Sequence, residues 1–279
     1  MGVLLPVFFA VSCVVVGDTA GKLLVEGGVA PGFVAWSRFG IAALALLPVL
    51  RPAGREWRAL LGWRLWLRGA LIAGGIISIL TALRTAPIAD VFGAFFVGPI
   101  VSYVLSALLL GERVTLPRTL LLLAGFGGVL LVVRPGFSAP EGIGFALLAG
   151  CFYGGYLAAT RWLAGAWRPG LLLLSQLVAG AVLLAPVGVA LVPADWTPRL
   201  VMLIAVSAGG SALGNYVLVR VSRKVPGSVV APLVYTQLIS ATVAGLAVFG
   251  DWPDPIAFLG LTVILASGLG SLALVARGR

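Results

Sequence analysis

Two oppositely charged residues inside apolar stretches are the first candidates for chemistry in this 279-residue chain. Asp18 lies in a stretch over residues 3–25, and Arg38 lies in the next, over residues 31–50. Each is about seven residues from the connection between the stretches, which is roughly 10 Å of helix from one membrane surface. A charge buried in hydrocarbon is costly, so each is a functional candidate. They can form an ion pair that gates a pathway or contact a solute, or Asp18 can pair with Lys22 one turn on.

Neutral polar side chains in other stretches suit a cavity for an amphipathic solute, because they combine an apolar body with a polar tip. The predicted substrate-binding residues are Tyr235, Gln237, Tyr103, Tyr153, Tyr156, Trp36 and Ser78. Gln176 and Asn215 form an inner polar pair, for which hydrogen bonding between helices and lining of the pathway are both open. Pro99 and Pro232 each interrupt an apolar stretch, so they are candidates for bending or gating.

Enzymatic chemistry is disfavoured by what the chain lacks. It has no histidine, and its acids do not cluster with metal-ligand spacing. We therefore expect no catalytic residue, no metal and no cofactor. Cys13 and Cys151 each fall inside an apolar stretch, where small core residues are expected rather than a disulfide.

The elements that must position these residues are membrane-spanning helices, because only 10% of the chain is charged and its mean hydropathy is +1.13. Runs of about 18 or more apolar residues recur between short polar breaks, and no alternating strand pattern is seen. The sequence predicts an all-α membrane protein with ten spans, over residues 3–25, 31–50, 67–84, 88–110, 117–133, 140–163, 170–192, 199–220, 227–249 and 255–275.

The distribution of basic residues predicts the orientation. Only Lys22, Arg84, Arg134 and Arg199 fall on the second side of the membrane, while most of the 19 basic residues fall on the side of the N-terminus. Both termini are therefore predicted to be cytoplasmic. The net charge of +10 sets this topology, so nucleic acid is not an expected partner.

The chain also repeats itself. A shift of 139 residues places Pro87 on Pro226, Gly111 on Gly250 and Glu112 on Asp251. Five spans in each half is an odd number, so the second half enters the membrane from the opposite side. We predict two inverted repeats, residues 1–137 and 138–279, an arrangement typical of carriers that work by alternating access.

The sequence Leu110-Gly111-Glu112-Arg113-Val114 closes the fourth span, and Gly250-Asp251 echoes it in the second half. Together with Arg38 and Pro99, this pattern resembles the drug/metabolite transporter superfamily, EamA type, over nearly the whole chain. The resemblance implies an exporter of amino acids or related small metabolites in the bacterial inner membrane.

The expected function is therefore export by alternating access, with the solute in a cavity at mid-membrane between the repeats. The alternatives are an uptake permease or facilitator for another small metabolite or drug and, with less support, an intramembrane enzyme. Expected partners are a small-molecule substrate and the lipid bilayer, with the protein as a monomer. Proton coupling, exchange and facilitated transport all stay open.

Overall fold

The computed structural model describes residues 3–85, 88–112, 114–133, 142–250 and 255–277, and these residues form helices and connections with no strand. Pro87, Arg113, Arg134 and Asp251, which the sequence analysis used, lie outside these residues, and so does the side chain of Pro232. The helices are α1 Leu4–Glu26, α2 Pro31–Leu50, α3 Gly54–Ala59, α4 Trp63–Ala82, α5 Ile88–Phe95, α6 Val97–Leu110, α7 Leu116–Val133, α8 Ile143–Leu163, α9 Pro169–Ala190, α10 Pro198–Ser222, α11 Gly227–Val234, α12 Gln237–Ala244, the π-helix η1 Gly245–Phe249 and α13 Pro255–Arg277.

The predicted all-α class is confirmed, and six described helices are long and apolar enough to cross a membrane: α1, α2, α4, α8, α9 and α10. Helical structure is favoured because hydrocarbon offers no partner to backbone polar groups. Shorter apolar helices occupy the other predicted spans, so the count of ten spans stays a prediction. The short helix α3 was not predicted.

Two predicted spans are broken near their middle, at equivalent places. Residues 88–110 divide into α5 and α6 at Phe96, and residues 227–249 divide after α11 at Tyr235 and Thr236. A shift of 139 residues places Phe96 on Tyr235, and their rings touch edge to face with centroids 5.6 Å apart. The two broken helices therefore meet at their breaks.

The prolines flank these breaks rather than occupy them. Pro99 is buried in the first turn of α6. Backbone N–H groups of a first turn have no acceptor within the helix, so a proline there costs no helical hydrogen bond. Pro232 lies in α11, three residues before Tyr235. Gly111 and Gly250 end the two broken spans with φ of 63° and 75°, a left-handed conformation that glycine adopts without strain. The repeated glycine in the sequence is thus a repeated helix end.

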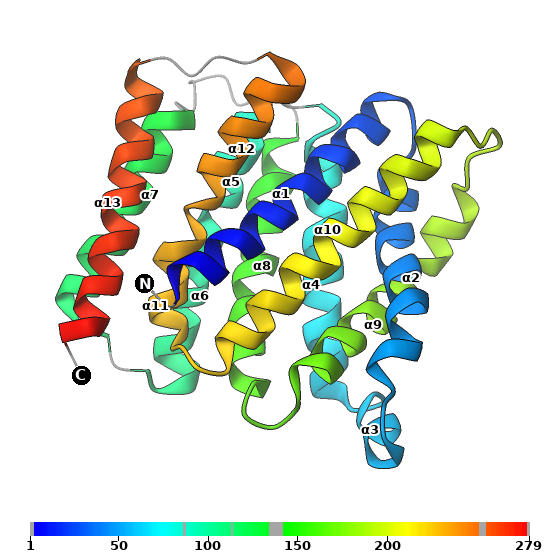
Figure 1. The fold of residues 1–279 in the computed structure, drawn as a ribbon, viewed down its shortest axis with the longest axis horizontal. Coiled ribbons are helices and arrows are strands. Elements are labelled where there is room, and N and C mark those ends of the chain that lie inside the picture. The colour runs from blue at the N-terminus through cyan, green and yellow to red at the C-terminus, as the bar shows by residue number, and fades with distance from the viewer. Residues whose placement is uncertain (1–2, 86–87, 113, 134–141, 251–254, 278–279) are drawn as a thin grey trace.

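Glycines bring two pairs of helices into backbone contact. α1 and α10 run side by side across the molecule (Figure 1), and a Cβ added at Gly210 would lie 2.7 Å from the carbonyl oxygen of Cys13. In α6 and α8, a Cβ added at Gly98 would lie 2.8 Å from the carbonyl oxygen of Gly150. Small residues at these positions therefore allow the helix backbones to approach closely.

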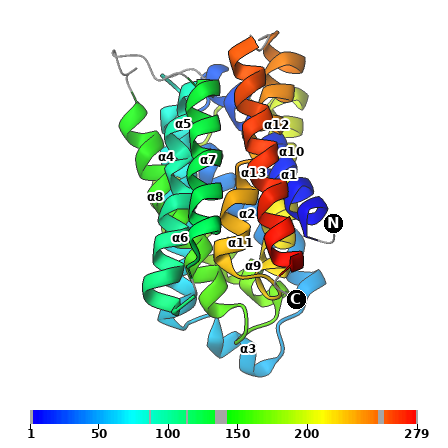
Figure 2. The same cartoon turned by 90° about the vertical axis from the view of Figure 1, so that its left-hand side faces the viewer.

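The bundle has two ends. The α3 end also holds the α6–α7, α8–α9 and α10–α11 connections, and the opposite end holds the α1–α2 and α9–α10 connections (Figure 1). α7 and α13 pack together at one edge (Figure 2). At the α3 end Arg168 donates to Glu56 over 2.6 Å, and this hydrogen bond lowers the pKa of the Glu56 carboxyl. Arg161 of α8 donates to Glu112 over 2.9 Å, so charged contacts join the two halves here.

The predicted orientation has a direct test. Arg55 in α3 and Asp195 in the α9–α10 connection are both exposed, and their elements lie at opposite ends of the bundle. In a variant without Cys13 and Cys151, a cysteine placed at Asp195 should react with an impermeant thiol reagent in intact cells, while one placed at Arg55 should react only after permeabilisation. The reverse labelling would show that the α3 end faces outward.

Candidate solute-binding site

A small cavity lies at the centre of the bundle, where seven helices from both halves converge. Its polar lining comes from Asp18, Arg38, Tyr153, Ser211, Asn215 and Gln237, and the remainder from Val14, Ile72, Gly75, Ile76, Ile79 and Phe95. The cavity measures about 30 Å³, which is room for water but not for a metabolite. The structure is therefore closed around this site.

Of the two ion pairs that the sequence left open for Asp18, the structure contains the one with Arg38. Arg38 Nη1 donates to Asp18 Oδ1 over 2.8 Å, and the two side chains are 2% and 6% exposed. Lys22 instead lies 3.5 Å from Glu26 and stacks over the ring of Phe249. Pairing offsets part of the free-energy cost of burying these two groups away from water.

Several buried polar atoms beside this pair have no partner. Among the described residues they include Arg38 Nε, the Tyr153 hydroxyl and both amide atoms of Gln237, and all three residues line the same cavity. An unpaired buried polar group costs roughly 1–3 kcal/mol. These atoms suit a solute that offers both donors and acceptors, with water in its place when the site is empty.

An aromatic wall adjoins these polar atoms. The rings of Phe95 and Tyr153 are 5.0 Å apart between centroids at 37°, and Tyr153 stacks on Tyr156 at 6.0 Å and 26°. Flat aromatic faces favour contact with another flat ring. The site therefore combines an aromatic surface with an unpaired amide.

A buried hydrogen-bond network extends from the cavity toward the α3 end. The Tyr156 hydroxyl accepts from Arg68, and its one proton can be donated to the amide oxygen of Gln176, at 2.9 Å, or to that of Asn215, at 3.0 Å. The predicted inner pair, Gln176 and Asn215, thus takes part in hydrogen bonds between helices. Asn215 also lines the cavity. The cavity and Tyr156 are thus one polar system.

Arg68 at the centre of this network is the residue that sequence reasoning missed. The predicted span began at residue 67, so Arg68 stood at its very start and was counted with the basic residues of the adjoining connection, whereas α4 begins at Trp63 and buries Arg68 completely. Its Nε donates to Thr160 over 2.8 Å and its Nη1 to the carbonyl of Leu172 over 2.7 Å. No carboxylate of the described part of the chain pairs with it.

A sequence signal for Arg68 did exist. Leu65, Arg68 and Ile72 share one face of a helix by their spacing, and all three are buried. Extending the span to Trp63 would therefore have placed Arg68 among core positions. The rule that assigns basic residues near span ends to loops outweighed this pattern.

The other predicted residues lie outside the central cavity, so their role in binding stays a prediction. The hydroxyl of Tyr103 bonds to Thr119 over 2.8 Å, and Trp36 packs on Gly188. Ser78 is buried in α4. Tyr235 is buried at the helix break with its hydroxyl unpartnered.

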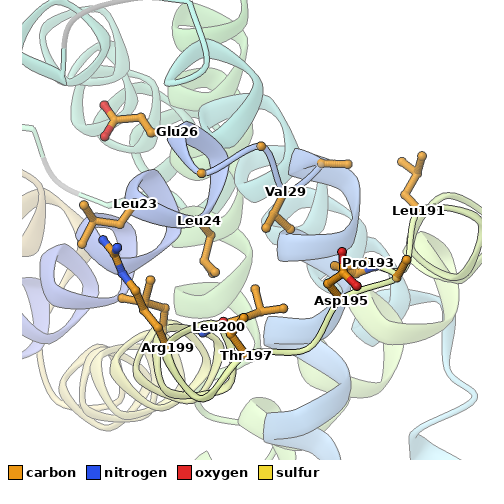
Figure 3. A pocket seen from close by; sticks show the side chains of 15 residues that line it. Leu23, Leu24, Glu26, Val29, Leu191, Pro193, Asp195, Thr197, Arg199 and Leu200 are labelled. Atoms are coloured by element: carbon orange, nitrogen blue, oxygen red, sulfur yellow. Dashed lines mark hydrogen bonds between the residues drawn. The ribbon is translucent and has the colours of Figure 1, made fainter.

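A larger hollow of about 700 Å³ opens at the end opposite α3, and no sequence pattern predicted it. Figure 3 shows Glu26 from the end of α1, with Asp195 and Arg199 from the α9–α10 connection and the start of α10, around its rim. Closely packed α1 and α10 separate this region from the cavity, and Ser207 donates to the Gly17 carbonyl over 2.9 Å there. The hollow thus stops short of the central site.

The charged pair can be tested by a double-mutant cycle in detergent. Asp18→Asn and Arg38→Gln should each lower the thermal unfolding midpoint, because each leaves one buried charge unpaired. The double variant should lose less stability than the sum of the two single losses, with a coupling free energy of about 2 kcal/mol. Additive losses would mean that the two residues act separately.

Comparison with known proteins identifies the family. The family model "EamA-like transporter family" matches twice, at residues 1–134 and 140–273. The chain is 29% identical over 247 residues to the "Riboflavin transporter" of Rhizobium johnstonii, covering 84% of this chain and 78% of that protein. It is 24% identical over 243 residues to the "S-adenosylmethionine uptake transporter" of Rickettsia conorii, covering 85% and 81%.

A "Riboflavin transporter" of Vibrio cholerae is 26% identical over 263 residues, covering 91% of this chain and 86% of that protein. A crystal structure with 19% identity aligns over 100% of this chain and 99% of its own, with a TM-score of 0.77, which supports the fold. The predicted family resemblance is confirmed. The chain is a multi-pass transporter of the bacterial inner membrane, and it belongs to the EamA-like transporter family.

Proposed function

We propose that this protein takes a small, flat metabolite into the cell by alternating access of two inverted repeats, residues 1–137 and 138–279, with the solute in the central cavity. The observation that carries the proposal is the convergence of unpaired polar atoms from Arg38, Tyr153 and Gln237 on one closed cavity. Because the cavity is too small for a solute in this structure, transport requires the helices around it to separate.

The expected export of amino acids finds no support in the relatives, and the alternative of uptake fits them better. The relatives are named as riboflavin transporters and S-adenosylmethionine uptake transporters. Both of those solutes contain a flat nitrogen heterocycle. The ring pair Phe95 and Tyr153 offers a matching aromatic face.

Charge favours a neutral solute such as riboflavin over S-adenosylmethionine, which carries net positive charge. Among the described side chains that line the cavity, Asp18 is the only carboxylate, and Arg38 neutralises it. Arg68 adds a further cation, connected to the cavity through Tyr156 and Asn215. A cationic solute would thus be buried beside excess positive charge.

Gln237 supports the same choice. Its unpaired amide offers one acceptor and a donor group, and the edge of a flavin ring carries carbonyl oxygens next to an N–H group. Paired hydrogen bonds of this kind fix a ring in the plane of the amide. We therefore propose a neutral heteroaromatic metabolite of the flavin type as the solute.

Counterflow in proteoliposomes tests the function. Vesicles loaded with unlabelled riboflavin should accumulate labelled riboflavin from outside, whereas vesicles loaded with S-adenosylmethionine or an amino acid mixture should not. Vesicles without protein control for leakage. Counterflow of S-adenosylmethionine or amino acids without that of riboflavin would overturn the proposed solute, and uptake into cells that need external riboflavin would establish the direction.

A further inference from the structure

Two apolar grooves lie on the sides of the bundle, away from the central cavity. The first, which we call the α8 groove, is lined by Leu67 and Leu71 of α4, Leu105 and Leu109 of α6, and Ala158 and Trp162 of α8, and measures about 430 Å³. The second, the α1 groove, lies between α1, α10 and the α12–η1 segment and measures about 550 Å³.

The two grooves occupy equivalent positions in the two halves. A shift of 135 residues, which aligns Ala73-Gly74-Gly75 with Ala208-Gly209-Gly210, places Leu71 on Val206. A shift of 139 places Leu109 on Val248. Each pair has one member in each groove. The α8 groove is lined by the start of α4 and the ends of α6 and α8, which lie toward the α3 end of the bundle (Figure 1). The α1 groove is lined in part by the start of α10, which lies toward the opposite end. One surface feature is therefore present twice, once toward each end of the bundle.

An arginine stands at the end of each groove. Arg64 precedes Leu67 by three residues and Leu71 by seven, so the three share one face of α4. Its guanidinium lies 5.6 Å from the ring of Trp63 and 5.2 Å from that of Trp162. Arg64 is exposed and, within the described residues, forms no ion pair. Its charge is therefore available to a partner.

We propose that the α8 groove binds one anionic phospholipid, with an acyl chain along the groove and the phosphate on Arg64. The groove wall is exposed on a membrane-spanning surface, where Leu109 is 72% exposed. Lipid acyl chains therefore cover the groove in a membrane. Tryptophans at its end favour the depth of lipid headgroups. A guanidinium binds a phosphate through paired hydrogen bonds, which adds selectivity for an anionic lipid.

The α1 groove is the internal control. Its arginine is Arg199, which a shift of 135 residues places on Arg64 and which precedes Leu203 and Val206 on one face of α10. No tryptophan pair flanks Arg199 among the described ring contacts. Arg199 instead lines the hollow at the end opposite α3, together with Glu26 and Asp195 (Figure 3). These two carboxylates repel a phosphate. We therefore assign the anionic lipid to the α8 groove alone.

Native mass spectrometry of the purified full chain tests this assignment, with dioleoyl phosphatidylglycerol and dioleoyl phosphatidylcholine as the probes. The wild type should bind the anionic lipid more tightly. Arg64→Gln should weaken that binding about fivefold and remove the preference over phosphatidylcholine. Arg55→Gln, at an exposed position of α3, and Arg199→Gln should each change it by less than about twofold.

The groove itself is tested by filling it. Leu109→Trp should weaken binding of phosphatidylglycerol, whereas Val248→Trp, at the equivalent position of the α1 groove, should leave it at the wild-type level. Glycerol phosphate should not compete. Equal affinity for the two lipids, wild-type affinity in Arg64→Gln, a larger loss in Arg199→Gln, or competition by glycerol phosphate would each overturn the proposal.

Discussion

Replacing Gln237 by leucine should lower the rate of riboflavin counterflow about 10- to 100-fold, with the amount of folded protein unchanged. Leucine has nearly the same volume but offers neither donor nor acceptor. Because both amide atoms of Gln237 are unpartnered in the closed structure, removing them breaks no internal hydrogen bond. The loss should therefore fall on the solute, and it should be measured in proteoliposomes with matched protein content.

The matched control is Thr242→Val on the same helix, α12. Within the described residues the Thr242 hydroxyl bonds only to the carbonyl of Leu238 one turn earlier, so its removal should alter neither transport nor stability. Gln237→Glu is a second probe, because it keeps the shape of the side chain but adds a negative charge beside the neutralised Asp18. This variant should also lose riboflavin counterflow. Wild-type counterflow by Gln237→Leu would move the solute site away from this cavity.

Replacing Arg68 should have the largest effect on folding. Arg68→Met removes the donors to Thr160, Leu172 and Tyr156, and hydrogen bonds from charged donors contribute roughly 1.5–3 kcal/mol each. We expect a loss of about 3 kcal/mol or more, seen as a lower unfolding midpoint in detergent. The loss should be less than the full sum, because removing an unpaired buried cation also relieves its desolvation.

Arg68→Lys distinguishes charge from geometry. A single ammonium group does not span the three acceptors that a planar guanidinium reaches, so lysine should not restore stability. Arg64→Met on the same helix is the control, because Arg64 is exposed and makes only ring contacts in the described structure. If Arg68→Lys were as stable as the wild type, the positive charge alone would be sufficient.

Hydropathy was enough to locate the long helices, because a membrane span needs a long apolar run whatever its tertiary contacts. Predicted spans over residues 31–50 and 170–192 match α2 and α9 within two residues. The breaks at Phe96 and Tyr235 were anticipated only through nearby prolines. Their positions depend on packing between two helices far apart in sequence, which local patterns do not encode.

The site was predictable in its residue types but not in its grouping. Asp18 and Arg38 were placed near one surface and Asn215 near the other, yet all three line one cavity. Depth along a helix was estimated as if each helix were perpendicular to the membrane, whereas α1 and α10 run obliquely across the bundle (Figure 1). Which tyrosines face the cavity depends on the rotation of each helix, and that is set by its neighbours.

Arg68 also bears on how the protein is made. Its partners Tyr156 and Leu172 follow it by 88 and 104 residues, so the ribosome completes α4 well before α8 and α9 exist. At about 5–20 residues per second, that interval is roughly 4–20 s. During it the arginine is an isolated charge on a new helix, and insertion of such a residue at a helix centre costs roughly 2.5–3.5 kcal/mol. Since Arg68 is near the start of α4, its long side chain can reach the lipid headgroups until the later helices arrive. Biogenesis should thus include a shallow early position of α4, which deepens only when the second half of the chain is synthesised.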